Sequence, residues 1–470
     1  MSQNLGGKVR ALRRRQGMTQ VRMAERLGIS ASYLNLIEHD KRPLSAALLI
    51  KLTQHFDVDL STFAAEGDSQ LEADLMEIFG DPMFDSHNLT NTDIQDLVRQ
   101  SPAISRSLIT LFATYRSAKD SAENLASRVL GQSAAVARRL PSEEVSDLIQ
   151  RRNNHFPDLE SSAELLWKRA SFDKDDIYTG MVRYLREECD VRVRVVTQQA
   201  DRAVRRYDPD RREIRISEVL APRSRHFQIA HQIGLLTQGD VLDPICQDEV
   251  LTTDDSRRLA RMVLANYFAG AVLMPYQPFR DAAEQERYDI ELLGHRFRTS
   301  FEQVCHRLTT LQRAGSEGVP FHLIKIDPAG NVSKRFSASG IRFSRFGGAC
   351  PRWNVTRAFS FQGNIRMQLS RMPDGQAYFC VARTLGRRHG GFRAPETTFA
   401  IGLGCRIEEA RRLVYSEGID LDNTDAVEPI GVTCRLCERL DCEQRAFPSL
   451  QHPLKLDENV RGVGFYADVD

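Results

Sequence analysis

Three cysteines near the C-terminus are spaced closely enough to bind one metal centre. The motif Cys-x2-Cys-x4-Cys is formed by Cys434, Cys437 and Cys442. A fourth thiolate would complete an all-sulfur set, and we expect it from Cys350 in the segment Gly-Gly-Ala-Cys-Pro. The substitutes for that ligand are Cys380 and Cys405. Such a set suits zinc or an iron–sulfur cluster, and spacing does not decide between them. Reduced thiols without a metal are the remaining alternative.

A second group with chemical potential lies on a predicted helix in the middle of the chain. The helix resembles the active-site helix of the ImmA/IrrE peptidases, whose His-Glu-x-x-His motif places two zinc ligands on one face and a catalytic base between them. His231 is present here, but Gln232 replaces the base and Leu235 replaces the second ligand. Met262 falls near the position of the family's third ligand, and His226 lies on another face of the helix. We expect no catalysis, and a groove that remains available to a small ligand.

The first 60 residues combine positive charge with the pattern of two helices joined by a tight turn. Ten Lys or Arg stand against five Asp or Glu in this segment, which suits contact with phosphate. Thr19 and Ser30 can cap successive helices, and Gly28 between them can take the left-handed conformation. The side chains expected to face inward are Met23, Ala24, Leu27, Ile29, Leu34 and Ile37.

The second of these helices would present its N-terminal end to base edges in the major groove. The expected reading residues are Ser30, Ala31, Ser32, Tyr33 and Asn35. Phosphate contacts, which set affinity and not sequence choice, are expected from Gln20, Arg10, Arg13 and Arg42. The segment resembles the lambda-repressor-like helix-turn-helix family of the Cro/C1 and Xre type. This resemblance implies double-stranded operator DNA as a partner.

The rest of the composition limits location and redox state. Residues 61–100 reverse the charge, with nine acidic residues against one arginine. The sequence shows no run of about 18 apolar residues and no leader with a cleavage site, so we expect neither membrane insertion nor secretion, but a cytoplasmic protein. Nine cysteines, an odd number, then favour reduced thiols or metal ligands over a disulfide framework.

With 470 residues the chain is too long for one hydrophobic core, and we predict a multidomain α+β protein. Its expected parts are an all-α helix-turn-helix domain (1–66), a helical linker or oligomerisation segment (67–150), a zincin-like α+β domain without catalytic metal (151–315) and an α+β domain with the cysteine cluster (316–470). We expect strands at 191–196 and 213–216 around a turn at 207–210, and long helices at 224–236 and 256–273.

The linker segment carries apolar residues at spacings of three and four, typical of an amphipathic helix. These residues are Ile94, Leu97, Val98, Leu108, Leu111, Phe112 and Tyr115. Such a helix could pack against the sensory region or against another subunit.

The order of these parts, with Gly-Gly-Ala-Cys-Pro-Arg-Trp-Asn preceding the Cys motif, resembles the short-chain fatty acyl-CoA transcriptional regulators along nearly the whole chain. The resemblance implies a non-catalytic regulator of propionate and acetate metabolism. It also implies a short-chain acyl-CoA such as propionyl-CoA as effector, and a [4Fe–4S] cluster at the cysteines. Helix-turn-helix modules commonly bind half-sites as dimers, so we expect a homodimer or a higher homo-oligomer.

Coenzyme A carries several phosphate charges, so its site needs converging Arg or Lys side chains beside an apolar slot. The candidate effector-binding residues are Arg205, Tyr207, His231, Lys325, Lys334, Arg335 and Arg342. Two alternatives stay open. One is a redox-sensing Xre-type repressor that uses its metal or iron–sulfur centre without acyl-CoA, and the other is an ImmA/IrrE-type metallopeptidase.

Overall fold

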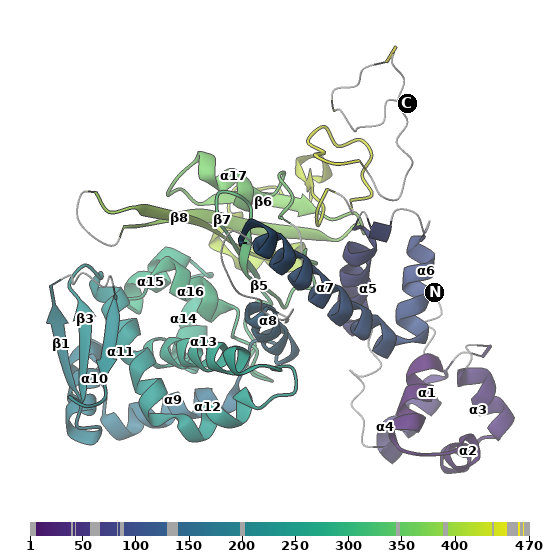
Figure 1. Ribbon diagram of the computed structural model, residues 1–470, viewed down its shortest axis with the longest axis horizontal. Helices are drawn as coiled ribbons and strands as arrows, with labels where there is room; N and C mark the ends of the chain where they lie inside the picture. The colour runs from purple at the N-terminus through teal and green to yellow at the C-terminus, as the bar shows by residue number, and fades with distance from the viewer. Residues whose placement is uncertain are drawn as a thin grey trace. The chain divides into compact units, whose positions relative to one another are not determined.

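The computed structural model describes residues 6–38, 41–42, 44–56, 66–81, 83–84, 89–128, 140–197, 203–344, 348–388, 393–434, 437–448, 459–460 and 464. Backbone contacts divide the chain into two compact units. Unit 1 consists of Met1–Ala137 and Leu450–Pro453, and unit 2 of Arg138–Ser449 and Leu454–Asp470. In the described ranges unit 1 is helical and unit 2 contains helices and two sheets, which confirms the predicted multidomain α+β class (Figure 1). Within those ranges, no helix is both long and apolar enough to cross a membrane.

Unit 1 contains the predicted helix-turn-helix and most of the helical segment predicted at 67–150, whose last part belongs to unit 2. Its described helices are α1 (Gly6–Arg15), α2 (Gln20–Leu27), α3 (Ala31–Glu38), α4 (Ala46–Phe56), α5 (Glu66–Phe79), α6 (Asn91–Gln100) and α7 (Pro102–Arg128). Helices α1–α4 share one apolar core in which Met23, Leu34 and Leu52 are almost fully buried. Helix α6 begins at a capping box between Thr90 and Asp93, and α7 packs against both α5 and α6.

The first part of unit 2 is built from helices around a small sheet. Its helices are α8 (Pro141–Arg151), α9 (Pro157–Ala170), α10 (Ile177–Glu188), α11 (Pro222–Thr237), α12 (Gly239–Cys246), α13 (Asp254–Leu273), α14 (Tyr276–Gln285), α15 (Ile290–Arg296) and α16 (Phe301–Leu308). The sheet has the order β1-β3-β2, with β1 (Arg192–Val196) parallel to β3 (Glu213–Ser217) and β2 (Arg205–Asp208) antiparallel to it.

Most of the predicted elements in this part are confirmed. The two predicted strands are β1 and β3, and the two predicted long helices are α11 and α13. The turn predicted at 207–210 is wrong in its first half, because Tyr207 and Asp208 are the last residues of β2. They pair with Ile214 and Glu213 of β3, so ladder hydrogen bonds keep these residues extended before the chain reverses.

A second sheet forms the remainder of unit 2. It contains β4 (His322–Ile326), β5 (Val332–Ser337), β6 (Arg366–Arg371), β7 (Ala377–Arg388), β8 (Glu396–Arg406) and β9 (Glu428–Pro429), in the order β5-β4-β8-β7-β6-β9. Strands β7 and β8 are the long strands of this sheet, with 12 and 11 residues. The short helical segments are α17 (Asn354–Arg357) and the 3-10 turns η3 (Ala358–Ser360), η4 (Ile407–Arg412), η5 (Val414–Ser416) and η6 (Thr424–Ala426).

Both faces of this second sheet are covered. Alternate residues of one strand enter different cores, as Leu323 and Ile324 of β4 show. Leu323 packs in the core that α14–α16 contribute to, and Ile324 packs in the core that contains Trp353 and Val355. All five residues of β4 are buried, as expected for an interior strand covered on both sides.

Candidate functional site

The predicted turn between α2 and α3 is confirmed in its local geometry. The Thr19 side chain accepts a hydrogen bond from the Arg22 N–H, and the Ser30 side chain accepts one from the Tyr33 N–H at 3.1 Å. Gly28 ends α2 with φ 69° and ψ 38°, the left-handed conformation that glycine adopts without a steric penalty. The side chains predicted to face inward are buried, except for Ile29, which is half-buried. These contacts fix the angle at which α3 leaves the module.

The N-terminal end of α3 presents small and polar side chains. Ser30, Ser32 and Asn35 are exposed, and Ala31 and Tyr33 are half-buried. A helix end of this kind can enter the major groove and form hydrogen bonds with base edges. These five residues remain the predicted base-reading set.

Two of the residues predicted to contact phosphate are engaged inside the module. The Arg13 guanidinium donates to both carboxylate oxygens of the fully buried Glu38 side chain, at 2.6 and 3.0 Å. Gln20 Nε2 donates to Glu38 at 2.8 Å and to Asn35 at 3.2 Å. Burial works to raise the pKa of Glu38, but the hydrogen bonds and the Arg13 charge hold it below its ordinary value. These contacts favour a structural role for Arg13. The better-placed candidates for phosphate contact are the half-buried Arg10 and the exposed Arg42.

His231 lies in the middle of α11, and both of its ring nitrogens have partners. Nδ1 is 2.6 Å from Arg205 Nη1, and because a guanidinium only donates, Nδ1 is the acceptor. The proton then lies on Nε2, which faces the Met262 carbonyl oxygen at 3.3 Å. Burial and the Arg205 charge lower the pKa of His231 to about 4, so the ring stays neutral. Neither nitrogen is free to bind a metal ion.

Arg205 therefore lies beside the one remaining ligand of the peptidase motif, a contact that the sequence did not reveal. Its Nη1 also donates to the Gln228 carbonyl oxygen at 3.1 Å. In the described ranges it forms no ion pair with a carboxylate, and burial lowers its pKa to about 10, which leaves it charged at neutral pH. Gln232 is buried, and Leu235 is half-buried. A cation thus lies next to the position that a zinc ion would need.

A second cationic group lies at the β4–β5 edge of the larger sheet. Lys325 and Lys334 are directly opposed across the two antiparallel strands, an arrangement in which like charges repel. The buried Lys325 ammonium donates to Glu302 at 2.8 Å and lies 4.3 Å from the centre of the Phe399 ring. Lys334 keeps a largely exposed surface, yet surrounding protein atoms and the Lys325 charge lower the pKa of its ammonium to about 8. Within the described ranges Glu302 is bonded to Lys325, and Lys334 forms no ion pair with a carboxylate.

His306 of α16 adds a neutral ring to this group. Its Nε2 lies 3.9 Å from Glu302 Oε1, and burial together with the charges of Lys334 and Lys325 lowers the pKa of the ring. His306 therefore adds no positive charge at neutral pH and no second counter-charge for the lysines. The site has a net positive charge.

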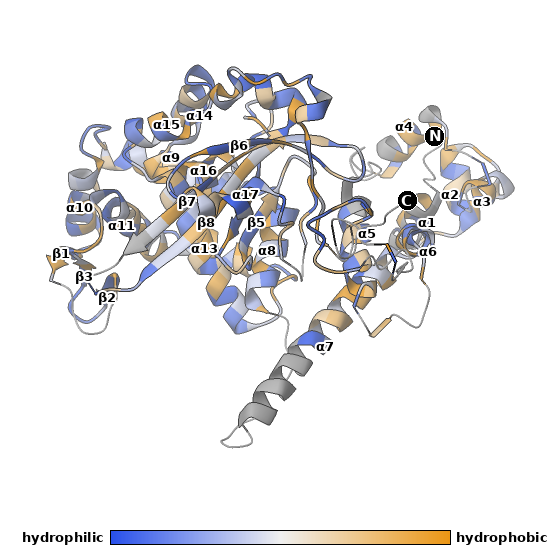
Figure 2. Ribbon diagram, turned by 90° about the horizontal axis from the view of Figure 1, so that it is seen from above, coloured by the Kyte–Doolittle hydropathy of each residue, from blue (hydrophilic) through white to orange (hydrophobic). Residues whose placement is uncertain are grey.

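The other predicted effector residues fall into two groups. Arg335 and Arg342 lie near Lys334 in the sequence. Arg335 donates to the Ser344 carbonyl oxygen at 3.0 Å, and Arg342 is half-buried. The half-buried Tyr207 belongs with Arg205 and His231, on β2 and α11. Figures 1 and 2 show β3 and α11 at one end of unit 2 and β5 nearer its middle. Phe336 and Phe343, which could have lined an acyl slot, are instead buried in the core.

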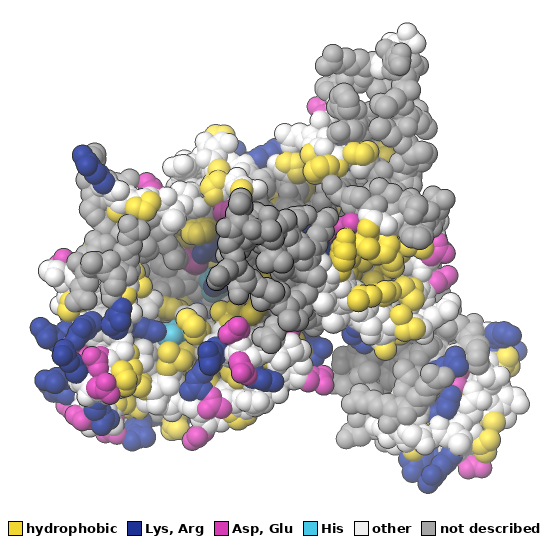
Figure 3. All heavy atoms as spheres, viewed as in Figure 1, with side chains coloured by type: hydrophobic (Ala, Val, Ile, Leu, Met, Phe, Trp, Pro, Cys, Tyr) yellow, Lys and Arg dark blue, Asp and Glu magenta, His cyan; other side chains and the backbone are white. Residues whose placement is uncertain are grey.

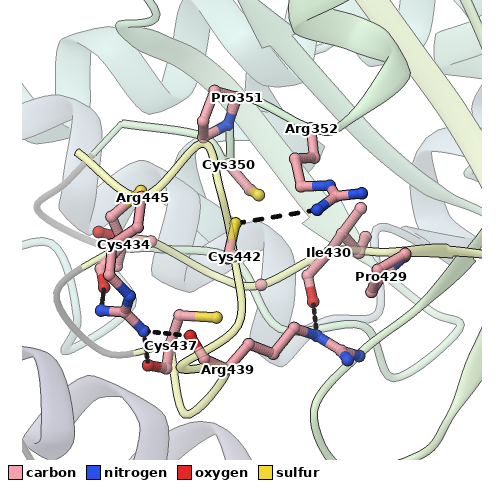
Figure 4. A pocket seen from close by; sticks show the side chains of 12 residues that line it. Cys350, Pro351, Arg352, Pro429, Ile430, Cys434, Cys437, Arg439, Cys442 and Arg445 are labelled. Atoms are coloured by element: carbon pink, nitrogen blue, oxygen red, sulfur yellow. Dashed lines mark hydrogen bonds between the residues drawn. The ribbon is translucent and has the colours of Figure 1, made fainter. Parts of the chain in front are cut away.

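The four predicted cysteine ligands line one small hollow that is partly open to solvent. Figure 4 shows Cys350, Cys437 and Cys442 with their sulfur atoms directed toward the same space, and Cys434 at its edge. The two substitutes lie elsewhere, because Cys380 contacts His322 at 3.5 Å and Cys405 is buried among apolar side chains. Cys350 is therefore the best-placed fourth thiol.

Three arginines surround this hollow. The Arg352 guanidinium lies 4.0 Å from Cys442 Sγ, and the buried Arg445 donates to the carbonyl oxygens of Cys434 and Cys437. Arg439 donates to the Ile430 carbonyl oxygen. Burial raises the pKa of Cys350, and negative charge on Cys434 and Cys437 would raise it further. A cationic centre would relieve that repulsion between thiolates.

An all-thiolate set with arginines around it fits a soft metal or an iron–sulfur centre chemically. In the part of the chain that the structure describes, no three Cys, His, Asp or Glu side chains converge closely enough to hold one metal ion. A single zinc ion requires four sulfurs at about 2.3 Å from one point. A cluster places each thiolate on a different iron atom, so it accepts ligands that are more widely spaced.

Comparisons with known proteins match the same three parts. Residues 9–63 match a helix-turn-helix family, residues 186–309 the IrrE N-terminal-like domain, and residues 310–466 the family described as short-chain fatty acyl coenzyme A regulator, C-terminal. The chain is 40% identical to the HTH-type transcriptional regulator PrpR of Mycobacterium tuberculosis over 456 residues, which cover 97% of this chain and 94% of that protein.

The chain belongs to the short-chain fatty acyl-CoA regulator family. It is 41% identical to RamB of Mycobacterium tuberculosis, over 98% of both chains, and 39% identical to the propionyl-CoA carboxylase regulator of Cereibacter sphaeroides over the full length of both. A solved structure titled Mycobacterium tuberculosis transcriptional regulator is similar with a TM-score of 0.68 and 42% identity, and covers 70% of this chain and all of that one. This member of the family is a DNA-binding transcriptional regulator and not a peptidase.

Proposed function

We propose that this regulator controls genes for short-chain fatty acid use, such as propionate and acetate metabolism, in response to a short-chain acyl-CoA. It would act in the cytoplasm as a homo-oligomer on double-stranded operator DNA. The family description of residues 310–466 and the name of the Cereibacter sphaeroides relative support this ligand class. The observation that carries the proposal is the opposed pair of Lys325 and Lys334, in which Lys325 is bonded to Glu302 and Lys334 forms no ion pair with a carboxylate in the described ranges.

Coenzyme A would supply the negative charge that this pair lacks. Its phosphate groups accept charge-assisted hydrogen bonds from ammonium groups, the stronger class of hydrogen bond in proteins. Phe399 beside Lys325 provides an apolar surface for the rest of the ligand. Binding would affect the operator only if the ligand favours one arrangement of the protein over another, because equal affinity for two arrangements shifts neither.

The test is a calorimetric titration of the full chain with propionyl-CoA, combined with operator binding at fixed salt. We expect Lys334→Gln to weaken propionyl-CoA binding by roughly 10- to 100-fold, since a hydrogen bond to a charged group contributes about 1.5–3 kcal/mol. Lys174→Gln removes an exposed lysine elsewhere in unit 2 and should leave binding unchanged. Absence of propionyl-CoA binding to the unmodified chain would reject the effector, and equal effects of the two variants would reject this site.

For the cysteine site we propose a metal centre, with a [4Fe–4S] cluster preferred and zinc as the alternative. Cys350, Cys434, Cys437 and Cys442 would hold it, and a cluster would supply a redox-active group that ties together distant parts of the chain. The observation in favour is that these four thiols line one hollow, with Arg352 directed at Cys442. A repressor that responds to redox state and ignores acyl-CoA is the second candidate function, and the same hollow supports it.

Iron, zinc and acid-labile sulfide analysis of anaerobically purified protein distinguishes these centres. We expect iron and sulfide in similar amounts, and their loss in Cys442→Ser. Cys189→Ser changes a half-buried cysteine outside the hollow and should retain the centre. Protein with neither metal nor sulfide, or equal loss in both variants, would contradict the assignment. Operator binding that follows the redox state but not propionyl-CoA would favour the second candidate.

A further inference from the structure

Helix α7 has two apolar faces, and the fold of unit 1 buries one of them. Ile109, Phe112 and Ala113 are buried on the side where α7 packs on α5 and α6. On the other face, Ile104 and Leu111 are 55% and 65% exposed. Large apolar side chains with so much exposed surface on one helix indicate an interaction surface.

The exposed face has a regular spacing. Ile104, Leu108, Leu111 and Tyr115 follow one another at steps of four, three and four residues. Leu108 is half-buried, and Tyr115 is 39% exposed. This spacing matches the a and d positions of a heptad, which keep one seam of a helix facing a partner helix. We call these four residues the α7 seam. Figure 2 shows hydrophobic residues along the coloured part of α7, and Figure 3 shows hydrophobic side chains gathered on the surface over α5–α7.

The polar side chains beside the α7 seam already have hydrogen-bond partners within their own helix. The hydroxyl groups of Ser107, Thr110 and Thr114 donate to carbonyl oxygens one turn earlier in the same helix, at 3.0, 2.9 and 2.8 Å. A partner helix can therefore cover them without leaving a donor unpaired. Arg106 is the single charged residue between positions 102 and 115. A helix face meant for water normally carries many charges.

We propose that the α7 seam is the surface through which two copies of this chain pair. A nearly uncharged heptad seam is compatible with itself, because two copies bring apolar side chains together and no opposed carboxylates. Unit 1 also contains the reading helix α3, and helix-turn-helix modules bind two half-sites as pairs. Contact through α7 would join two reading helices without using the sensory unit.

The test measures self-association of the full chain by sedimentation, without DNA or acyl-CoA, so its outcome is independent of the effector proposal. We expect a dimer of the 53.3-kDa chain. Leu111→Glu should weaken self-association by about 100-fold or more, because it places charges in an apolar seam. Leu165→Glu is the matched control, since Leu165 on α9 is 64% exposed, almost as much as Leu111.

A charge-swap experiment identifies the second copy as the partner. Leu111 lies near the middle of the α7 seam, so two copies of position 111 approach each other whichever way the helices run. Leu111→Glu mixed with Leu111→Lys should therefore restore dimers that neither variant forms alone. A monomeric unmodified chain, a dimeric Leu111→Glu variant, equal dissociation in Leu165→Glu, or a mixture that stays monomeric would each overturn the proposal. The last result would assign the seam to a different partner, such as the sensory unit of the same chain.

Discussion

Removing the carboxylate of Glu160 should destabilise unit 2 strongly, because Glu160 and Arg307 form a buried ion pair. Their side chains are each 1% exposed, and the two pairs of atoms lie 2.5 and 2.9 Å apart. Tyr267 also donates to Glu160 at 2.6 Å, and Arg307 donates to the Met274 carbonyl oxygen at 2.9 Å. Helices α9, α13 and α16 are therefore joined at one point inside the protein.

The magnitude follows from the burial. Glu160→Gln leaves the Arg307 charge in the interior without a counter-charge, and breaking such a pair costs about 3–5 kcal/mol. For a large folded unit, 1 kcal/mol shifts the melting temperature by about 2–4 °C, so we expect a decrease of roughly 6–20 °C. The matched control is Glu188→Gln, which breaks the Arg169–Glu188 pair at 2.7 Å with side chains that are 65% and 46% exposed. The control should not shift the melting temperature measurably, because water screens an exposed pair.

The pH dependence gives a second measurement of the same effect. Burial works to raise the pKa of Glu160, but the charge and hydrogen bonds of Arg307 hold it below its ordinary value. A depressed pKa stabilises the folded state above the unfolded pKa of about 4.3, and that contribution is lost as the pH falls through the folded value. The difference in melting temperature between the unmodified chain and Glu160→Gln should therefore be constant near neutrality and shrink below about pH 4. A difference under 2 °C at pH 7, or an equal decrease in Glu188→Gln, would refute the reasoning.

Three further predictions concern the proposed sites. Propionyl-CoA binding measured by calorimetry should weaken between pH 7 and 9, because the pKa of Lys334 is about 8 and the lysine loses its charge above that pH. Lys334→Arg should remove this pH dependence. Binding to the unmodified chain that does not change between pH 7 and 9 would contradict the prediction. Asn35→Ala should weaken binding to the operator roughly 10-fold or more and leave binding to random DNA nearly unchanged. Arg42→Ala should weaken binding to the operator and to random DNA equally, and should lower the slope of log affinity against log salt concentration by about one. The reverse pattern in binding titrations would exchange the roles of the two residues. His231→Ala should leave the zinc content by elemental analysis unchanged, and any loss of zinc would revive the metallopeptidase interpretation.

Features that depend on neighbouring residues in the chain could be predicted from the sequence. The turn between α2 and α3 follows from the caps at Thr19 and Ser30 and from the left-handed Gly28, all of which act within four residues. The bounds of helices α11 and α13 lie within two residues of those predicted from the sequence. These signals need no knowledge of distant contacts.

Features that depend on distant contacts could not be predicted in the same way. Arg13 carries the same charge as its neighbours in the sequence, but only the packing of α1 on α3 brings it to Glu38. Arg205 meets His231 because β2 pairs with β3 and α11 covers that sheet, contacts that join residues 26 positions apart. The four cysteines converge because the loop at Cys350 and the loop after β9 lie side by side. Residue types indicated the candidates in each case, and tertiary structure decided their partners.

The guanidinium beside His231 also has an evolutionary consequence. Gln232→Glu and Leu235→His would restore the residues of the His-Glu-x-x-His motif, yet a divalent ion bound to His231 would still be repelled by the Arg205 charge on the same ring. No single substitution would therefore restore peptidase activity, and each one made alone would give no catalytic advantage. Zinc binding at this helix would therefore require changes at Gln232, at Leu235 and at Arg205 together.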